Sequence, residues 1–340
     1  MQKCLPPTIY TRILEQLMDA FDSVLEPVHF VELSCLLVHE YRKKHQMKYN
    51  ELMQKAEKIY SSNTAEFDRN PLAKVHFHSS YARFLSNKKD PSEQQNIEKE
   101  NQIALKVCHA SLGDRHPETA ATLLLTGIIA QRLWERNVAK ARLTKALELS
   151  QQVLGKHFMT AETLKAIADL LLSSNKPENL KTCLEYYEAA VEMLNYLGVG
   201  ESKESILPLK NFASCHVDSG NFNEAMALLT KAEQIAEREL ERNHTWKVSI
   251  KTSLALLHEK MGNVEWAKNA MLKGLSMHKE LGLAIDKIRN SHMVREFMNR
   301  YPETFPEAEF PCKYKTEYFI TYYIIIKLNL CPLSDCTRRG

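Results

Sequence analysis

The chain has 340 residues, and 45 Lys and Arg residues against 42 Asp and Glu residues leave a formal net charge of only +3. That balance argues against nucleic acid as the main partner. Only 10 residues are glycine, and because phosphate-binding loops and β-turns need residues that tolerate positive φ, the composition disfavours a Gly-rich nucleotide-binding fold and an all-β barrel. Charged residues make up 26% and hydrophobic residues 44% of the chain, which is typical of a helical protein with a packed core.

The chain also lacks the usual marks of export or membrane insertion. No secretory signal is apparent after Met1, and no segment approaches the ~18 uninterrupted apolar residues of a membrane span. The 8 cysteines are scattered from Cys4 to Cys336, too thinly for a disulfide scaffold. We therefore expect a cytoplasmic protein with reduced thiols and no membrane partner.

Residues 1–115 are predicted to form a helical N-terminal region with degenerate repeats. Helical apolar spacing predicts helices over 5–26 and 28–62. Pro27 and Pro71 are expected to begin two of the early repeats, since proline is tolerated in the first turn of a helix.

Residues 116–286 carry a clearer internal repeat. Segments that begin at His116, His157, Ser202 and His244 align with spacings of 41, 45 and 42 residues. Each segment contains a first helix, a short turn, a second helix and a linker. Small and large apolar residues alternate along these helices, a pattern that predicts antiparallel helix pairs stacked into a superhelix. In the second helices the aligned positions are Ala139, Leu143 and Ala146; Cys183, Tyr187 and Ala190; Ala225, Leu229 and Ala232; and Ala267, Met271 and Gly274.

The turn between the two helices of a segment has its own signature. Gly220 and Gly262 are expected to open two of these turns. Asn221 lies three residues before Glu224, which predicts a capping box at the start of the second helix. Gly127 falls inside a predicted helix, at a small-residue position where two helices approach closely.

Three stretches carry a resemblance to a known family: the linker at 112–119 (LGDRHPET), the first-helix residues 211–215 (NFASC) and the turn at 220–222 (GNF). They resemble tetratricopeptide repeats of the kinesin-light-chain and nephrocystin type, clearly over about 116–286 and more faintly over 27–115. Similar repeats form the sensor ends of some nucleotide-binding immune-type receptors. The resemblance implies an all-α fold, a tetratricopeptide-like α-solenoid of stacked antiparallel helix pairs. It also implies capture of cargo peptides by asparagines on successive first helices, of which this chain keeps Asn211.

The C-terminal part is predicted to differ from the repeats. Residues 287–311 are expected to form a capping helix and a linker, with Phe297 on the apolar side of the helix and Pro302, Pro306 and Pro311 ending it. Residues 312–340 lack the repeat pattern and are expected to form an irregular tail.

Motifs for catalysis and cofactor binding are missing from the sequence. It contains neither a G-x-x-x-x-G-K-[ST] phosphate loop nor a G-x-G-x-x-G motif, and His39-Glu40 and His258-Glu259 lack the second histidine of a zinc protease. The spacing of Cys312, Cys331 and Cys336 is too loose for a zinc site. We therefore predict no enzyme activity, no catalytic residues, no metal, no cofactor and no small-molecule substrate.

The first helices of such a superhelix line its concave side, so their outward-facing residues are expected to form a groove for other proteins or peptide segments. Lys165, Lys210 and Arg132 suit acidic side chains or a terminal carboxylate, and Asn211 suits a peptide backbone amide. The full set of predicted groove residues is Leu124, Ile128, Arg132, Lys165, Asp169, Lys210, Asn211, Ser214, Thr252, Leu256 and Glu259.

Two functions remain open from the sequence. The first is a non-catalytic protein–protein interaction scaffold that binds partner peptides in this groove. The alternative is the C-terminal, partner-sensing repeat region of a multidomain nucleotide-binding signalling receptor. A phosphate-binding loop encoded upstream would favour the receptor.

Overall fold

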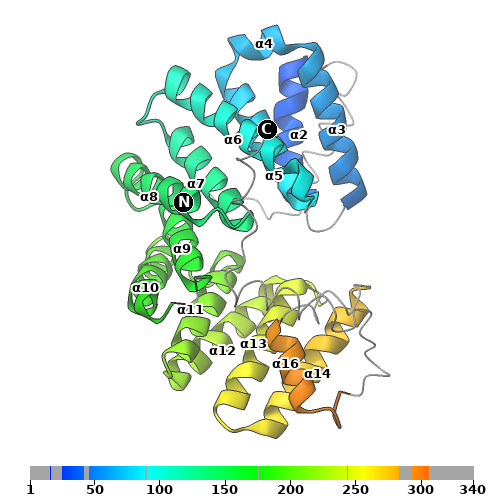
Figure 1. Cartoon of the computed structure of the whole chain (residues 1–340), viewed down its shortest axis with the longest axis vertical. Helices are drawn as coiled ribbons and strands as arrows, with labels where there is room; N and C mark the ends of the chain where they lie inside the picture. The colour runs from blue at the N-terminus through cyan, green and yellow to red at the C-terminus, as the bar shows by residue number, and fades with distance from the viewer. Residues whose placement is uncertain are drawn as a thin grey trace, which may run out of the picture. The chain divides into compact units, whose positions relative to one another are not determined.

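The structure, a computed structural model, describes residue 16 and residues 25–41, 46–88, 90–174, 176–242, 244–282 and 292–305. Within these ranges the chain forms helices and no strand (Figure 1). It divides into two compact units, residues 1–215 and residues 216–340. The all-α fold predicted from the sequence is confirmed, whereas the boundaries expected at 115, 286 and 311 stay predictions.

Unit 1 is built of helix pairs whose members pack side by side: α2 with α3, α5 with α6, α7 with α8 and α9 with α10 (Figure 1). The first helices also stack on one another, α2 on α5, α5 on α7 and α7 on α9. This regular stacking is what the repeat pattern predicted. The helices are α2 (Pro27–Tyr41), α3 (Gln46–Ser62), α4 (Thr64–Arg69), α5 (Pro71–Lys88), α6 (Gln94–Val107), α7 (Pro117–Arg132), α8 (Arg136–Val153), α9 (Phe158–Leu172), α10 (Leu180–Tyr196) and α11 (Ile206–Asp218), whose last residues belong to unit 2.

Unit 2 continues the helical pattern. Its described helices are α12 (Phe222–Glu239), α13 (Thr245–Lys260), α14 (Val264–Glu280) and α16 (His292–Arg300). Helix α13 packs against both α12 and α14. Buried residues of α16, including Val294 and Phe297, share an apolar cluster with Ala255 and Met271, so α16 covers the pair α13/α14 as a cap. Most of the predicted helix over 5–26 and all of the tail over 312–340 lie outside the described residues.

The histidines that align the repeats cap the first helices. The Nδ1 atoms of His116, His157 and His244 each accept a hydrogen bond of 3.1 Å from the backbone N–H two residues further on, at the starts of α7, α9 and α13. An accepting side chain at this position satisfies one of the free N–H groups of the first turn. The capping box predicted at Asn221 is wrong, because its backbone (φ −86°, ψ 70°) lies outside the extended region and its side chain makes no capping hydrogen bond.

Close packing between the two helices of a pair depends on small residues. A Cβ atom placed on Gly127 of α7 would lie 2.8 Å from the side chain of Leu143 on α8, closer than such atoms approach. Leu143 and its neighbours Ala139 and Ala146 are fully buried. The prediction that Gly127 marks a close approach of two helices is therefore confirmed.

Trp134 occupies the turn between α7 and α8 in an unusual conformation. Its φ is +64°, and it is the one residue other than glycine with positive φ among the described residues. The corresponding residues of later turns are Gly220 (φ +77°) and Gly262 (φ +79°). The three turns share one backbone hydrogen bond. In each turn, the residue directly after the positive-φ residue donates its N–H to the carbonyl of the residue four positions before the positive-φ residue. The indole is 75% exposed, so packing does not compensate for the strain.

We expect Trp134→Gly to stabilise unit 1 by about 1 kcal/mol, because glycine adopts this conformation without steric cost. Trp134→Ala is the matched control: it removes the indole but keeps the Cβ atom that causes the strain, so it is expected to give no such gain. Urea denaturation of the three proteins measures the difference. Equal stabilisation by both substitutions would assign the effect to the indole and contradict this explanation.

Candidate functional site

A polar cluster lies where α9, α10 and α11 meet in unit 1, and the carboxylate of Asp169 is its centre. Lys165, one turn earlier on α9, places its Nζ 3.1 Å from Asp169 Oδ2. Asn211 of α11 donates through Nδ2 to Asp169 Oδ1 at 2.8 Å. The hydroxyl of Tyr187 on α10 donates to the same oxygen. Asp169 therefore links three helices through one side chain.

Burial and neighbouring charges shift the pKa values of three residues in and around this cluster. Burial disfavours the charge of Lys165, but the carboxylates of Asp169 and Glu162 outweigh it, so the pKa of Lys165 is raised. Burial lowers the pKa of Lys210, and repulsion by Lys165 lowers it further. The attraction of Asp169 acts in the opposite direction but is smaller than the effect of burial. Burial likewise raises the pKa of Glu162, with a smaller opposing effect from Lys165. The pKa shifts of the two neighbouring lysines are thus opposite in direction, raised for Lys165 and lowered for Lys210.

The structure brings together only some of the predicted groove residues. Lys165, Asp169, Lys210 and Asn211 share the cluster, and Arg132 at the end of α7 is close enough to repel Lys165 electrostatically. The other predicted groove residues of unit 1 make different contacts. Leu124 and Ile128 are half-buried against the apolar core, and the Ser214 hydroxyl donates to the Lys210 carbonyl at 3.3 Å.

The predicted groove residues of unit 2 all lie on α13. Glu259 forms a bidentate ion pair with Arg300 of α16, with N–O distances of 2.8 and 2.7 Å. Thr252 donates to the carbonyl of Ser249 at 2.9 Å, and Leu256 packs against the apolar cluster that α16 covers. Glu259 therefore holds the cap of this unit.

Two members of the cluster were missed from the sequence. Tyr187 aligns with Leu143, Leu229 and Met271, which have no polar atom, so a hydroxyl at that position was a signal of a buried partner. Glu162 lies one helical turn before Lys165 on α9 and faces the same cluster. The sequence did not single it out, because a Glu and a Lys three residues apart are equally typical of an ion pair on a solvent-exposed helix face.

A second buried network joins α3, α5 and α6. The Tyr60 hydroxyl lies 2.8 Å from His78 Nε2, and His78 Nδ1 lies 2.5 Å from Glu100 Oε2. Burial, together with Asp68 and Glu100, raises the pKa of Tyr60 to about 12. Because a raised pKa makes the phenol a weaker nucleophile at neutral pH, this chain of hydrogen bonds is suited to holding the three helices together.

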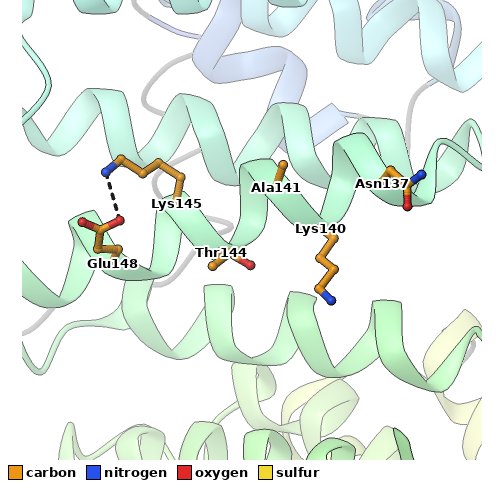
Figure 2. A pocket seen from close by; sticks show the side chains of 6 residues that line it. All are labelled: Asn137, Lys140, Ala141, Thr144, Lys145 and Glu148. Carbon is orange, nitrogen blue, oxygen red and sulfur yellow. Dashed lines mark hydrogen bonds and ion pairs between the residues drawn. The ribbon is translucent and has the colours of Figure 1, made fainter.

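One surface depression is open and lies along a single helix. It is lined by six residues of α8 (Figure 2), among which Lys145 and Glu148 form an ion pair of 2.9 Å. A pocket for a small molecule instead converges from several elements and encloses most of its ligand. Within the described ranges no three His, Cys, Asp or Glu residues are grouped to hold a metal ion. None of the described helices is long and apolar enough to cross a membrane.

Comparison with solved structures identifies the fold. A Rap protein complexed with competence and sporulation factor superimposes with a TM-score of 0.61 at 14% identity, covering 88% of this chain and 82% of that one. NprR in complex with its cognate peptide NprX gives 0.57 at 15%, covering 96% and 95%. A Podosopora anserina protein with nearly identical kinesin-light-chain TPR-like repeats gives 0.51 at 14%, covering 60% and 94%.

The chain has a tetratricopeptide-like repeat fold. At these identities the likeness concerns the fold alone, and it confirms the resemblance found in the linker and turn residues. No protein-family model and no curated protein sequence matches the chain.

Proposed function

We propose that this protein is a non-catalytic interaction protein that binds a partner peptide on the first-helix face of unit 1. In this proposal Lys210, with Lys165 and Arg132, attracts a carboxylate of the peptide, and Asn211 contacts the peptide backbone through its amide. The supporting observation is the polar cluster itself. Asp169 accepts from Lys165, Tyr187 and Asn211, and Lys210 lies close enough to Asp169 and Lys165 to interact electrostatically with both.

A ligand carboxylate would add an anion beside Lys165, near which two further cations, Lys210 and Arg132, lie. Hydrogen bonds between charged groups that are shielded from water are stronger than those at an exposed surface. Two neighbours of the same fold support a peptide ligand, since the Rap protein and NprR are described in complex with a peptide or signalling factor. The remaining predicted groove residues, from Leu124 to Glu259, stay candidates for lesser contacts.

The proposal is tested with a random heptapeptide library that carries a free C-terminal carboxylate and with the same library amidated at the C-terminus. Enriched peptides are titrated against the full chain by fluorescence anisotropy. Lys210→Met keeps the aliphatic stem but removes the charge, so the affinity is expected to fall about tenfold or more. Lys140→Met on the outer surface of α8 is the control and is expected to leave the affinity unchanged.

The two libraries separate the source of the carboxylate. If the terminal carboxylate is recognised, amidation abolishes enrichment. If an acidic side chain is recognised, both libraries enrich peptides that contain Asp or Glu. Failure of both libraries to enrich any peptide, or equal affinities of the wild-type and Lys210→Met proteins, would contradict the proposal.

A further inference from the structure

Two buried cysteines of neighbouring helices lie in direct contact beside the polar cluster. The Sγ atoms of Cys183 on α10 and Cys215 on α11 are 3.0 Å apart. The residues are 1% and 0% exposed and share an apolar cluster with Ala168 and Tyr187. A disulfide has an S–S distance of about 2.05 Å, so the two sulfur atoms would have to approach by roughly 1 Å for a bond to form.

We propose that Cys183 and Cys215 form a reversible dithiol–disulfide pair that is oxidised by a hydroperoxide such as hydrogen peroxide. The thiolate of one cysteine attacks a peroxide oxygen, forming a sulfenic acid and releasing one water after protonation. The second thiol attacks that sulfur, forms the S–S bond and releases a second water. The two thiols together lose two protons and two electrons, and the peroxide is reduced to two waters.

The position of the pair connects this chemistry to the polar cluster. Cys183 lies one helical turn before Tyr187, and Cys215 lies one turn after Asn211. Tyr187 and Asn211 are two of the donors that hold Asp169, and Cys183 Sγ is 3.4 Å from the carbonyl of Ala168. A disulfide would therefore fix the spacing of α10 and α11 within one turn of both donors.

The other two cysteines of the described ranges provide internal controls. Cys35 and Cys108 are buried as well. The thiol of Cys35 lies beside the hydroxyl of Ser80, and burial raises its pKa to about 12; burial also raises the pKa of Cys108. Cys108 lies 3.4 Å from the hydroxyl of Thr122. We expect neither thiol to enter a disulfide in the folded protein.

Peptide mapping tests the pair in the full chain. The reduced, folded protein is treated with hydrogen peroxide, its remaining thiols are alkylated under denaturing conditions, and it is digested with trypsin. The fragments 182–203 and 211–231 each contain one cysteine. We expect these two fragments as one cross-linked species, two hydrogen atoms lighter than their sum and separated by a thiol reductant. Recovery of both as alkylated or over-oxidised single peptides, or cross-linking only when the protein is unfolded first, would overturn the proposal.

Thermal unfolding gives a second readout. A cross-link between residues 32 positions apart restricts the unfolded chain, so peroxide is expected to raise the unfolding temperature by several degrees, reversibly with reductant. Cys183→Ser is expected to lose this rise and Cys108→Ser to retain it. A rise of the same size in the Cys183→Ser protein would overturn the assignment to this pair.

The effect on ligand binding rests on the proposed function and is tested separately. An enriched heptapeptide is titrated against the reduced protein and against protein in which the cross-link has been mapped. Because the tether acts within one turn of Tyr187 and Asn211, the two affinities are expected to differ about fivefold or more. Equal affinities would overturn regulation by the disulfide. The absence of peptide binding in the reduced protein would instead contradict the proposed function and leave the mapped disulfide unaffected.

Discussion

Replacement of Asp169 by alanine is expected to lower the free energy of unfolding of unit 1 by about 3 kcal/mol, because it leaves a largely buried cation without its partner. The side chain of Lys165 is only 15% exposed and that of Asp169 24%. The same substitution removes the acceptor of Tyr187 and Asn211. Chemical denaturation followed by circular dichroism measures the loss.

Two further variants separate the charge from the hydrogen bonds. Asp169→Asn keeps an oxygen that accepts from Tyr187 and Asn211 but removes the charge, so its loss is expected to be smaller than that of Asp169→Ala. Combining Asp169→Ala with Lys165→Met removes the unpaired cation and is expected to recover part of the stability, which a double-mutant cycle quantifies.

Glu178→Ala is the matched control for loss of a carboxylate. Glu178 lies in the turn between α9 and α10, where its side chain is 68% exposed and lies 3.9 Å from Lys176. Ion pairs in such exposed positions contribute little, so this variant is expected to have wild-type stability. If Asp169→Ala were no more destabilising than Glu178→Ala, the buried cluster would not stabilise unit 1.

The sequence was sufficient to predict the helix pairs because their signal is periodic. The segments that begin at His116, His157, Ser202 and His244 recur at spacings of 41, 45 and 42 residues, and the small residues of the second helices recur with them. Periodicity reports which face of a helix is buried, and stacking follows from those faces. For this reason the repeat fold could be predicted without a close relative.

The contacts within the cluster could be predicted only in part. Lys165 and Asp169 are i and i+4 on one helix, so their ion pair follows from spacing alone. The contacts of Asn211 with Asp169 and of Cys183 with Cys215 span 42 and 32 residues. Such contacts depend on the rotation and register of two packed helices. A shift of either helix by one residue along its axis would separate the contacting atoms.

The turns show a different limit of sequence reasoning. Gly220 and Gly262 predict a left-handed turn residue because glycine adopts that conformation freely. Trp134 occupies the same position in the first of these turns with no such preference. The repeat alignment places Trp134 as far from the start of its segment as Gly220 and Gly262 are from theirs. A tryptophan gives no sign of a positive φ, however, so a single-residue propensity could not have predicted its conformation.

Replacement of Phe297 by alanine is expected to destabilise unit 2 by about 4 kcal/mol, since it leaves a cavity under the cap formed by α16. Phe297 is 0% exposed and shares its apolar cluster with Met271 and Leu275 of α14. Its ring centroid lies 5.0 Å from that of Tyr301 and 5.9 Å from that of Phe305. The substitution therefore removes the centre of the contact between the cap and α14.

Hydrogen exchange of the full chain locates this effect better than global unfolding, because two units need not unfold in one step. The Phe297→Ala protein is expected to exchange faster in α13, α14 and α16, whereas the helices from α2 to α10 keep their protection. Met293→Ala is the control on the same helix, since Met293 is 59% exposed and its loss leaves no cavity. Equal protection of α13 and α14 in the two variants would show that these helices are stable without the contact made by α16.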